Sequence, residues 1–216
     1  EDELKKIAEV LRKFPRVVII SDDMYNRLMF EGEKIAPHLL QAAPDLKDRT
    51  VLINGGSKAY SMTGWRIGWA AGPTQIIKAM GDYVSQATGS ASSIAQAAAE
   101  KALIYSEADI INTNHMLKQR LESALNKLKE LPQLKVYKPD GAFYLWVNVS
   151  SLLGLTYEGT KVLTSAEFCK ILLEKFFVST VPGEEFGHPG YMRLSFAIET
   201  PRMNEAFDRM KQLISQ

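Results

Sequence analysis

The stretch TVLINGGSKAYSMTGWRIGWAAG, residues 50–72, decides how the rest of the chain is interpreted. It opens with the apolar run TVLIN, which predicts a buried strand. Small residues then surround one lysine, Lys58, and the segment RIGWAAG that begins at Arg66 predicts a further strand. In open α/β sheets, ligands lie beyond the carboxyl ends of the strands. A lone lysine at such a strand end therefore indicates a binding site.

The segments on either side of this stretch alternate between strand and helix patterns. Residues 1–14 predict an amphipathic helix, RVVII at residues 16–20 predicts a buried parallel strand, and two helical patterns follow Pro73. This alternation predicts a mixed or parallel sheet covered by helices. Asp22, Asp23 and Tyr25 directly follow the first strand. We therefore expect an aspartate, a tyrosine and Lys58 to converge on one crevice.

The second half of the chain has a different character. A single long helix is predicted over residues 109–131, and Pro132 ends it. After it, KVYKPDGAFYLWVNV predicts two strands around a turn, and shorter helices and strands follow to the C-terminus. The pattern indicates a small α+β unit over residues 132–216, joined to the first half by the long helix.

Composition narrows the possible function classes. The chain has 216 residues, 46% hydrophobic and 24% charged, with a net charge of +1, so nothing in its charge favours nucleic acid or a membrane surface. The single cysteine, Cys169, is typical of a reducing compartment such as the cytoplasm. His38, His115 and His188 lack the spacing of metal ligands, so no metal site is expected.

The charged side chains of residues 50–72 suit one cofactor. A lysine in an apolar site with small neighbours has a lowered pKa, because desolvation disfavours its ammonium, and the free amine can form a Schiff base. Arg66 offers a fork of donors suited to a phosphate. A lysine, a phosphate-binding arginine and an acid near a pyridine nitrogen are together what pyridoxal 5'-phosphate requires.

Three motifs carry a resemblance to a known family. SKAYSMTGWRIG (57–68), SDDMY (21–25) and GYMRLSFA (190–197) resemble the fold-type I, class I aminotransferases. Within that family, SKAYSMTGWRIGWAAGP and SSIAQAAAEKAL are most similar to the bacterial aspartate aminotransferase branch. The resemblance covers the C-terminal part of the family's chain. One departure is Gly56, which stands where the family has a larger apolar residue.

The resemblance implies an α/β architecture, the PLP-transferase fold of type I. Residues 1–108 would be the C-terminal part of the large, mostly parallel-sheet PLP-binding domain. Residues 109–131 would be the linking helix, and residues 132–216 the small α+β C-terminal domain.

The resemblance also implies roles for the cofactor-binding residues. Lys58 matches the lysine that forms the Schiff base with the cofactor and later moves the substrate α-proton. Asp22 matches the aspartate that keeps the pyridine nitrogen protonated, and Tyr25 matches the tyrosine that donates to the phenolate oxygen. Arg66 matches the phosphate-binding arginine, and Ser57 is a further candidate near the phosphate.

Arg193 matches the arginine that grips the substrate α-carboxylate. It alternates with Met192 and Leu194, so it faces away from them, and a charge on that face of a strand needs a partner. Trp65 and Trp69 are interpreted as core or packing residues. PGEEFG (182–187) resembles the family's loop near the substrate and is interpreted as shaping the site rather than taking part in the chemistry.

The expected function is PLP-dependent transamination between an L-amino acid, aspartate above others, and 2-oxoglutarate, in a cytoplasmic homodimer that binds neither nucleic acid nor membrane. The family's N-terminal part supplies further cofactor contacts, so these 216 residues alone are expected to show little or no turnover. Prephenate or aromatic transamination and carbon–sulfur lyase chemistry remain alternatives. An aminotransferase-like sensor domain of a transcription regulator is the alternative from another class.

Overall fold

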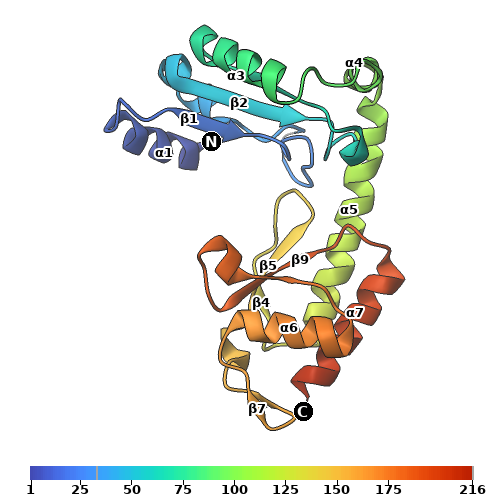
Figure 1. Ribbon diagram of the computed structural model, residues 1–216. Helices are drawn as coiled ribbons and strands as arrows, with labels where there is room; N and C mark the ends of the chain where they lie inside the picture. The colour runs from blue at the N-terminus through green and yellow to red at the C-terminus, as the bar shows by residue number, and fades with distance from the viewer. Residues whose placement is uncertain (33, 216) are drawn as a thin grey trace. The chain divides into compact units, whose positions relative to one another are not determined.

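The computed structural model describes residues 1–32 and 34–215, which divide into two compact units, Glu1–Asn114 and His115–Gln216 (Figure 1). The elements of the first unit are α1 (Asp2–Arg12), β1 (Ile19–Asp22), α2 (Leu39–Ala42), η1 (Pro44–Arg49), β2 (Thr50–Gly55), η2 (Thr63–Trp65), β3 (Gly68–Ala71), α3 (Thr74–Ala87) and α4 (Ser93–Tyr105). Helix α5 (Glu107–Leu128) runs from the first unit into the second.

The first unit is built on a three-stranded sheet in the order β1-β2-β3. Strands β1 and β2 are parallel and place Asp22 beside Ile53, whereas β3 runs antiparallel to β2. Helices α1 and α3 lie on opposite sides of this sheet (Figure 1). Because β1 and β2 are parallel, the segments that carry Tyr25 and Lys58 leave the sheet at the same edge.

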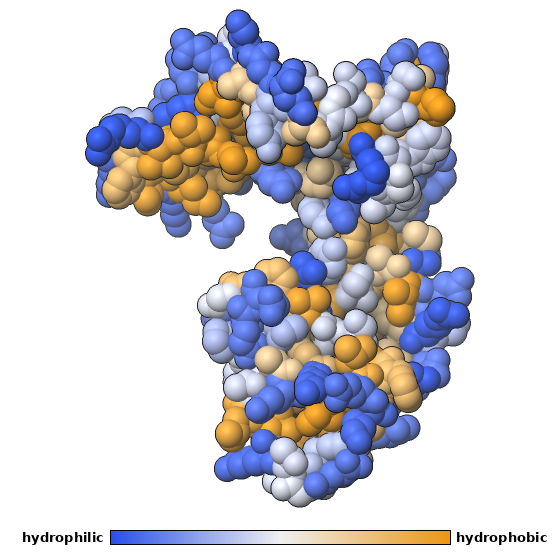
Figure 2. Space-filling view, in the orientation of Figure 1, coloured by the Kyte–Doolittle hydropathy of each residue, from blue (hydrophilic) through white to orange (hydrophobic). Residues whose placement is uncertain are grey.

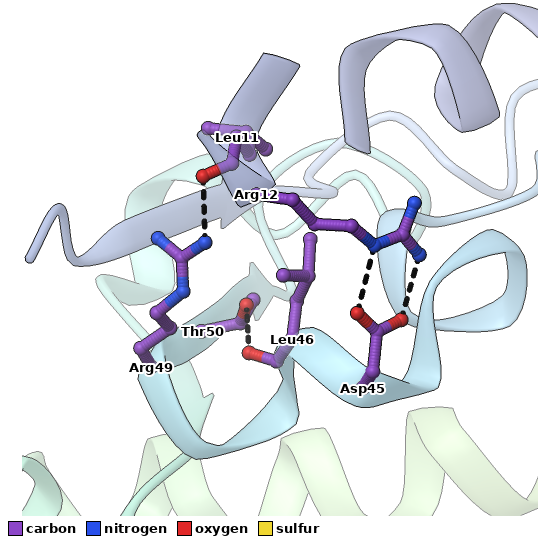
Figure 3. Close-up of polar contacts among 6 residues, drawn as sticks. All are labelled: Leu11, Arg12, Asp45, Leu46, Arg49 and Thr50. Carbon is purple, nitrogen blue, oxygen red and sulfur yellow. Dashed lines mark hydrogen bonds and ion pairs between the residues drawn. The ribbon is translucent and has the colours of Figure 1, made fainter. Parts of the chain in front are cut away.

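A small core fixes α1 and η1 against the sheet. Its buried members are Ala8, Ile19, Leu39, Ala43 and Leu46. Beside this core, the Arg49 guanidinium donates to three backbone carbonyls, those of Leu11 (2.7 Å), Phe14 (3.0 Å) and Val17 (2.7 Å). Figure 3 shows the bond to Leu11 together with the Arg12–Asp45 pair on the outer surface. Arg49 thus binds one carbonyl at the end of α1 and two carbonyls of the segment that follows, and ties both to the end of η1.

These bonds explain why the first strand begins later than predicted. The sequence predicted a strand over residues 16–20, and the structure has β1 at Ile19–Asp22. Val17 donates its N–H back to the Phe14 carbonyl, so this segment turns instead of extending. The third strand is likewise shorter than the predicted 66–72, because Arg66 adopts a left-handed backbone (φ 52°) before β3 begins.

An apolar patch lies over α1 and β1 (Figure 2). The large apolar side chains exposed in these elements and the turn between them are Ile7, Val10, Phe14, Val17, Val18 and Ile20. The outer edge of β1 pairs with no other strand of the described residues. Trp65 and Trp69 are also exposed, by 46% and 37%, so neither is a core residue.

The second unit contains the four-stranded sheet β4-β5-β9-β8. Its elements after α5 are β4 (Lys135–Val136), β5 (Tyr144–Asn148), η3 (Ser150–Leu152), β6 (Thr156–Tyr157), β7 (Thr160–Lys161), α6 (Ser165–Phe176), β8 (Val181–Pro182), η4 (Gly183–Phe186), β9 (Tyr191–Ser195) and α7 (Thr200–Ile214). Leu145 and Val147 on β5, and Met192 and Leu194 on β9, are buried. The alternate residues of both strands therefore lie on the opposite face of the sheet.

None of the helices in residues 1–32 and 34–215 combines the length and apolar character needed to cross a membrane. The same residues contain no group of three or more His, Cys, Asp or Glu that could hold a metal ion.

Candidate active site

Lys58 lies in a tight turn directly after β2. The turn is held by backbone hydrogen bonds from Gly56 N to the Ile67 carbonyl (3.1 Å) and from Met62 N to the Gly56 carbonyl (3.0 Å). A Cβ at Gly56 would approach the side chains of Ile67 and Met62 to 3.3 Å. This close packing suits glycine at the one position where the sequence departs from the family pattern. Lys58 is half-buried at the end of the strand.

Tyr25 approaches Lys58 from the neighbouring strand. The Lys58 Nζ lies 5.5 Å from the centre of the Tyr25 ring. Tyr25 belongs to the segment that follows β1, and Asp22 is the last residue of that strand. The Asp22 carboxylate is exposed and accepts a hydrogen bond from the Met24 N–H (3.3 Å). The structure thus brings together the amine and the phenol that the sequence predicted to converge, at the sheet edge where Asp22 ends β1.

Two asparagines that the sequence analysis did not single out join these segments. The Asn54 amide donates to the Asn26 side-chain oxygen (3.1 Å), and the Asn54 oxygen accepts from the Gly55 N–H (2.7 Å). Asn26 is the neighbour of Tyr25, and Asn54 lies four residues before Lys58. A polar residue that ends the apolar run TVLIN is a signal that could have pointed to Asn54.

Arg66 and Ser57 lie on the segment between β2 and β3. The exposed Arg66 guanidinium donates one hydrogen bond within the part of the chain that the structure describes, to the Thr63 carbonyl (3.0 Å). The Ser57 carbonyl accepts from the Thr63 hydroxyl (2.9 Å). Thr63 therefore ties Ser57 to the start of the turn that leads into Arg66, and most of the Arg66 donors stay available to a ligand.

Arg193 lies on β9 in the second unit. Its neighbours Met192 and Leu194 are buried and Arg193 is half-buried on the other face, so the predicted alternation is confirmed. Its Cζ atom lies 4.4 Å from the centre of the Tyr144 ring and 4.8 Å from that of Phe186. None of the ion pairs formed among residues 1–32 and 34–215 involves Arg193.

The turn that carries Phe186 is anchored to the start of α6. The Ser165 hydroxyl lies 2.7 and 2.8 Å from the two Glu184 carboxylate oxygens, and the Gly190 N–H donates to the Ser165 oxygen (2.8 Å). Burial by itself would raise the pKa of Glu184, but hydrogen bonds from Ser165 and from backbone N–H groups bring that pKa below its usual value.

Comparison with known proteins identifies the family. The sequence pattern of the aminotransferases of class I and II matches residues 1–210. The chain belongs to the class I and II aminotransferases. A probable aspartate/prephenate aminotransferase of Rickettsia bellii is 43% identical over 211 residues, which are 97% of this chain and 53% of that protein. The aspartate/prephenate aminotransferase of Nitrosomonas europaea is 40% identical over 99% of this chain and 54% of its own length.

Similarity to solved aminotransferase structures identifies the fold of the chain. The aspartate aminotransferase of Rhizobium meliloti superposes with a TM-score of 0.89 at 38% identity, over 96% of this chain and 52% of that chain. The Thermus thermophilus aspartate aminotransferase with maleate gives a TM-score of 0.84 at 31% identity, over 99% of this chain and 52% of that one. The fold of this aminotransferase chain is therefore the α/β fold of type I. The chain spans about half the length of the curated relatives that it matches.

The first unit of this aminotransferase chain has side chains that fit the family's cofactor, pyridoxal 5'-phosphate. Lys58 supplies the amine and Tyr25, 5.5 Å away, a phenol. Asp22 offers an exposed carboxylate, and Arg66 an exposed guanidinium that donates to the Thr63 carbonyl. The donor set thus contains the groups that an aldehyde, a phenolate oxygen, a pyridine nitrogen and a phosphate require.

Proposed function

We propose that the protein containing this chain transfers the amino group between L-aspartate and 2-oxoglutarate with pyridoxal 5'-phosphate. The observation that carries the proposal is the placement of Lys58 at the end of β2 with the Tyr25 ring 5.5 Å from its Nζ, in a chain of the aminotransferase family. A lysine held at a strand end beside a phenol is arranged for Schiff-base chemistry.

In the first unit, each site residue would act on one part of the reacting system. When bound, the cofactor supplies an aldehyde carbon and a ring that withdraws electrons. Lys58 would hold that carbon through Nζ and, once displaced by the substrate amine, move the substrate α-proton. Asp22 would keep a proton on the ring nitrogen, and Tyr25 would donate to the phenolate oxygen. Arg66, with Ser57 beside it, would bind the phosphate.

In the second unit, Arg193 would bind the substrate α-carboxylate. Its guanidinium presents a rigid fork of donors that matches a carboxylate with two parallel hydrogen bonds. Arg193 is half-buried and has no carboxylate partner among residues 1–32 and 34–215, so its guanidinium is available for this task.

The same proposal covers the organisation of the protein. Residues 1–108 are assigned to the large cofactor-binding domain, residues 109–131 to a linking helix and residues 132–216 to the small domain. A homodimer in the cytoplasm is the expected working form, because the family typically dimerises and a single buried cysteine suits a reducing compartment.

A borohydride experiment tests the role of Lys58. The chain is mixed with pyridoxal 5'-phosphate, reduced with borohydride and mapped by peptide mass spectrometry. A pyridoxyl group on Lys58, lost in Lys58→Ala and kept in Lys47→Ala, an exposed surface lysine, supports the proposal. If a longer protein containing this chain also leaves Lys58 unmodified and transaminates no amino acid, the proposal is wrong.

Prephenate is a second candidate substrate, because two of the relatives are named aspartate/prephenate aminotransferases. A panel of amino-acid and oxo-acid substrates, tested on the longer protein, distinguishes aspartate from prephenate as the substrate. Transfer from glutamate to prephenate as well as to oxaloacetate would show both activities. DNA binding without transamination would instead support the regulator alternative.

A further inference from the structure

Within the described residues, the Arg193 guanidinium lies against aromatic rings and forms no ion pair with a carboxylate. Its Cζ lies 4.4 Å from the Tyr144 ring centre and 4.8 Å from the Phe186 ring centre, both within cation–π range. Other arginines of the chain are held differently. Arg12 is paired with the Asp45 carboxylate (2.8 Å), and Arg49 donates to three carbonyls.

The kind of contact decides what remains for a ligand. A carboxylate or carbonyl partner uses up N–H donors, as in Arg12 and Arg49. A ring that faces a guanidinium attracts the positive charge of that guanidinium and accepts no hydrogen bond from it. The N–H groups stay free to donate to a ligand. Arg193 is therefore immobilised without losing the donors that bind a carboxylate.

The two rings come from separate, fixed elements. Tyr144 lies on β5, the neighbour of β9, on the same face as Arg193. Phe186 ends the turn η4, and although it is 47% exposed, Trp146 packs against it edge to face at 5.4 Å. Trp146 is directly opposite Arg193 in the strand register. Both rings that contact Arg193 are therefore supported by the sheet: Tyr144 lies on β5, and Phe186 packs against Trp146 of the same strand.

The backbone of η4 allows little adjustment. A Cβ at Gly183 would lie 2.1 Å from the His188 carbonyl oxygen, so the two ends of the turn are in close contact. The His188 N–H donates to the Gly183 carbonyl (2.9 Å), and Glu184 is held by Ser165. The backbone that carries Phe186 is consequently held by contacts within the turn and with the start of α6.

We infer that Tyr144 and Phe186 are positioning residues that hold the Arg193 guanidinium ready for the α-carboxylate of the substrate. The inference rests on the proposed function through the carboxylate role of Arg193. The inference assigns a task to the PGEEFG segment. Its phenylalanine, Phe186, orients the Arg193 guanidinium and does not contact the reacting atoms.

The test is an NMR titration of the 216-residue chain labelled with ¹⁵N-arginine. The Arg193 Nε–Hε resonance is assigned with Arg193→Lys and titrated with maleate, a dicarboxylate. In the wild-type chain we expect a proton resonance shifted upfield by the two rings and a response to maleate. Phe186→Leu and Tyr144→Leu should lose much of the upfield shift and raise the maleate midpoint at least about threefold.

Matched variants keep the result interpretable. Tyr144→Phe and Phe186→Tyr retain a ring and should restore the wild-type shift and midpoint. Tyr137→Leu removes a ring that is 93% exposed and should change neither quantity. An unchanged backbone amide spectrum in each variant shows that the second unit stays folded.

The outcomes separate this inference from the proposed function. Wild-type maleate midpoints in both leucine variants would overturn the positioning role and leave the carboxylate role of Arg193 standing. No response of wild-type Arg193 to maleate would overturn both. The pyridoxyl group on Lys58 is read independently of either result.

Discussion

The side-chain amide of Asn54 donates to the side-chain oxygen of Asn26 at 3.1 Å and so ties the end of β2 to the segment that follows β1. These two segments carry Lys58 and Tyr25. The link is partly buried, and the second Asn54 contact, from the Gly55 N–H at 2.7 Å, orients the amide. Two neutral side chains therefore link the segments that carry the amine and the phenol.

We predict that Asn54→Ala and Asn26→Ala slow the formation of the pyridoxyl group on Lys58. Loss of the amide link lets the two segments move apart, and small misplacements at a reacting centre cost as much as about 100-fold in rate. The measurement is the time course of borohydride-trapped pyridoxyl peptide. Asn126→Ala, which changes an exposed asparagine on α5, is the control. Wild-type time courses in both test variants would contradict the prediction.

Arg49 and Arg12 should differ in their effect on stability. Arg49→Met removes three hydrogen bonds to backbone carbonyls, and we expect the free energy of unfolding to fall by about 2 kcal/mol or more. Arg12→Met breaks an exposed pair with Asp45, which solvent screens, and should lower the free energy of unfolding by much less. Urea denaturation gives both values. Equal losses would show that the carbonyl contacts carry no special weight.

Glu184 should make the second unit sensitive to acid. Its pKa in the folded state is lowered, so its contribution to stability is present above the unfolded carboxyl pKa of about 4.3 and is lost as the pH falls through the folded pKa. We predict that the difference in stability between the wild type and Glu184→Gln is largest near neutral pH and shrinks below about pH 5. Urea titrations across this range measure it. A difference that grows on acidification would have the wrong sign.

The single thiol should be unreactive in the folded chain. Cys169 is 4% exposed, and burial raises the pKa of its thiol. Since the thiolate is the reacting form, modification by a disulfide reagent at pH 8 should be at least about tenfold slower in the native chain than in denaturant. A colorimetric thiol assay follows the reaction. Comparable rates in both conditions would mean that α6 opens readily.

Local sequence patterns predicted the elements that depend on neighbours along the chain. The alternation of Arg193 with Met192 and Leu194, and the strand that leads to Lys58, were read from residue spacing and are confirmed. The predicted start of β1 was wrong because Arg49, more than 30 residues away, binds the carbonyls of the turn that precedes β1. The Asn26–Asn54 link and the rings around Arg193 also join distant segments, and no periodicity encodes such contacts. The cofactor and substrate roles of all the site residues stay predictions, those of Asp22, Tyr25, Ser57, Lys58, Arg66 and Arg193.

The apolar patch over α1 and β1 has a practical consequence for anyone who purifies this chain. Exposed apolar side chains beside an unpaired strand edge attract other molecules of the same kind. Salts such as sulfate strengthen that attraction because they are excluded from protein surfaces. Ile20, 67% exposed on β1, is the natural place for a lysine substitution to extend the concentration range and shelf life of the sample.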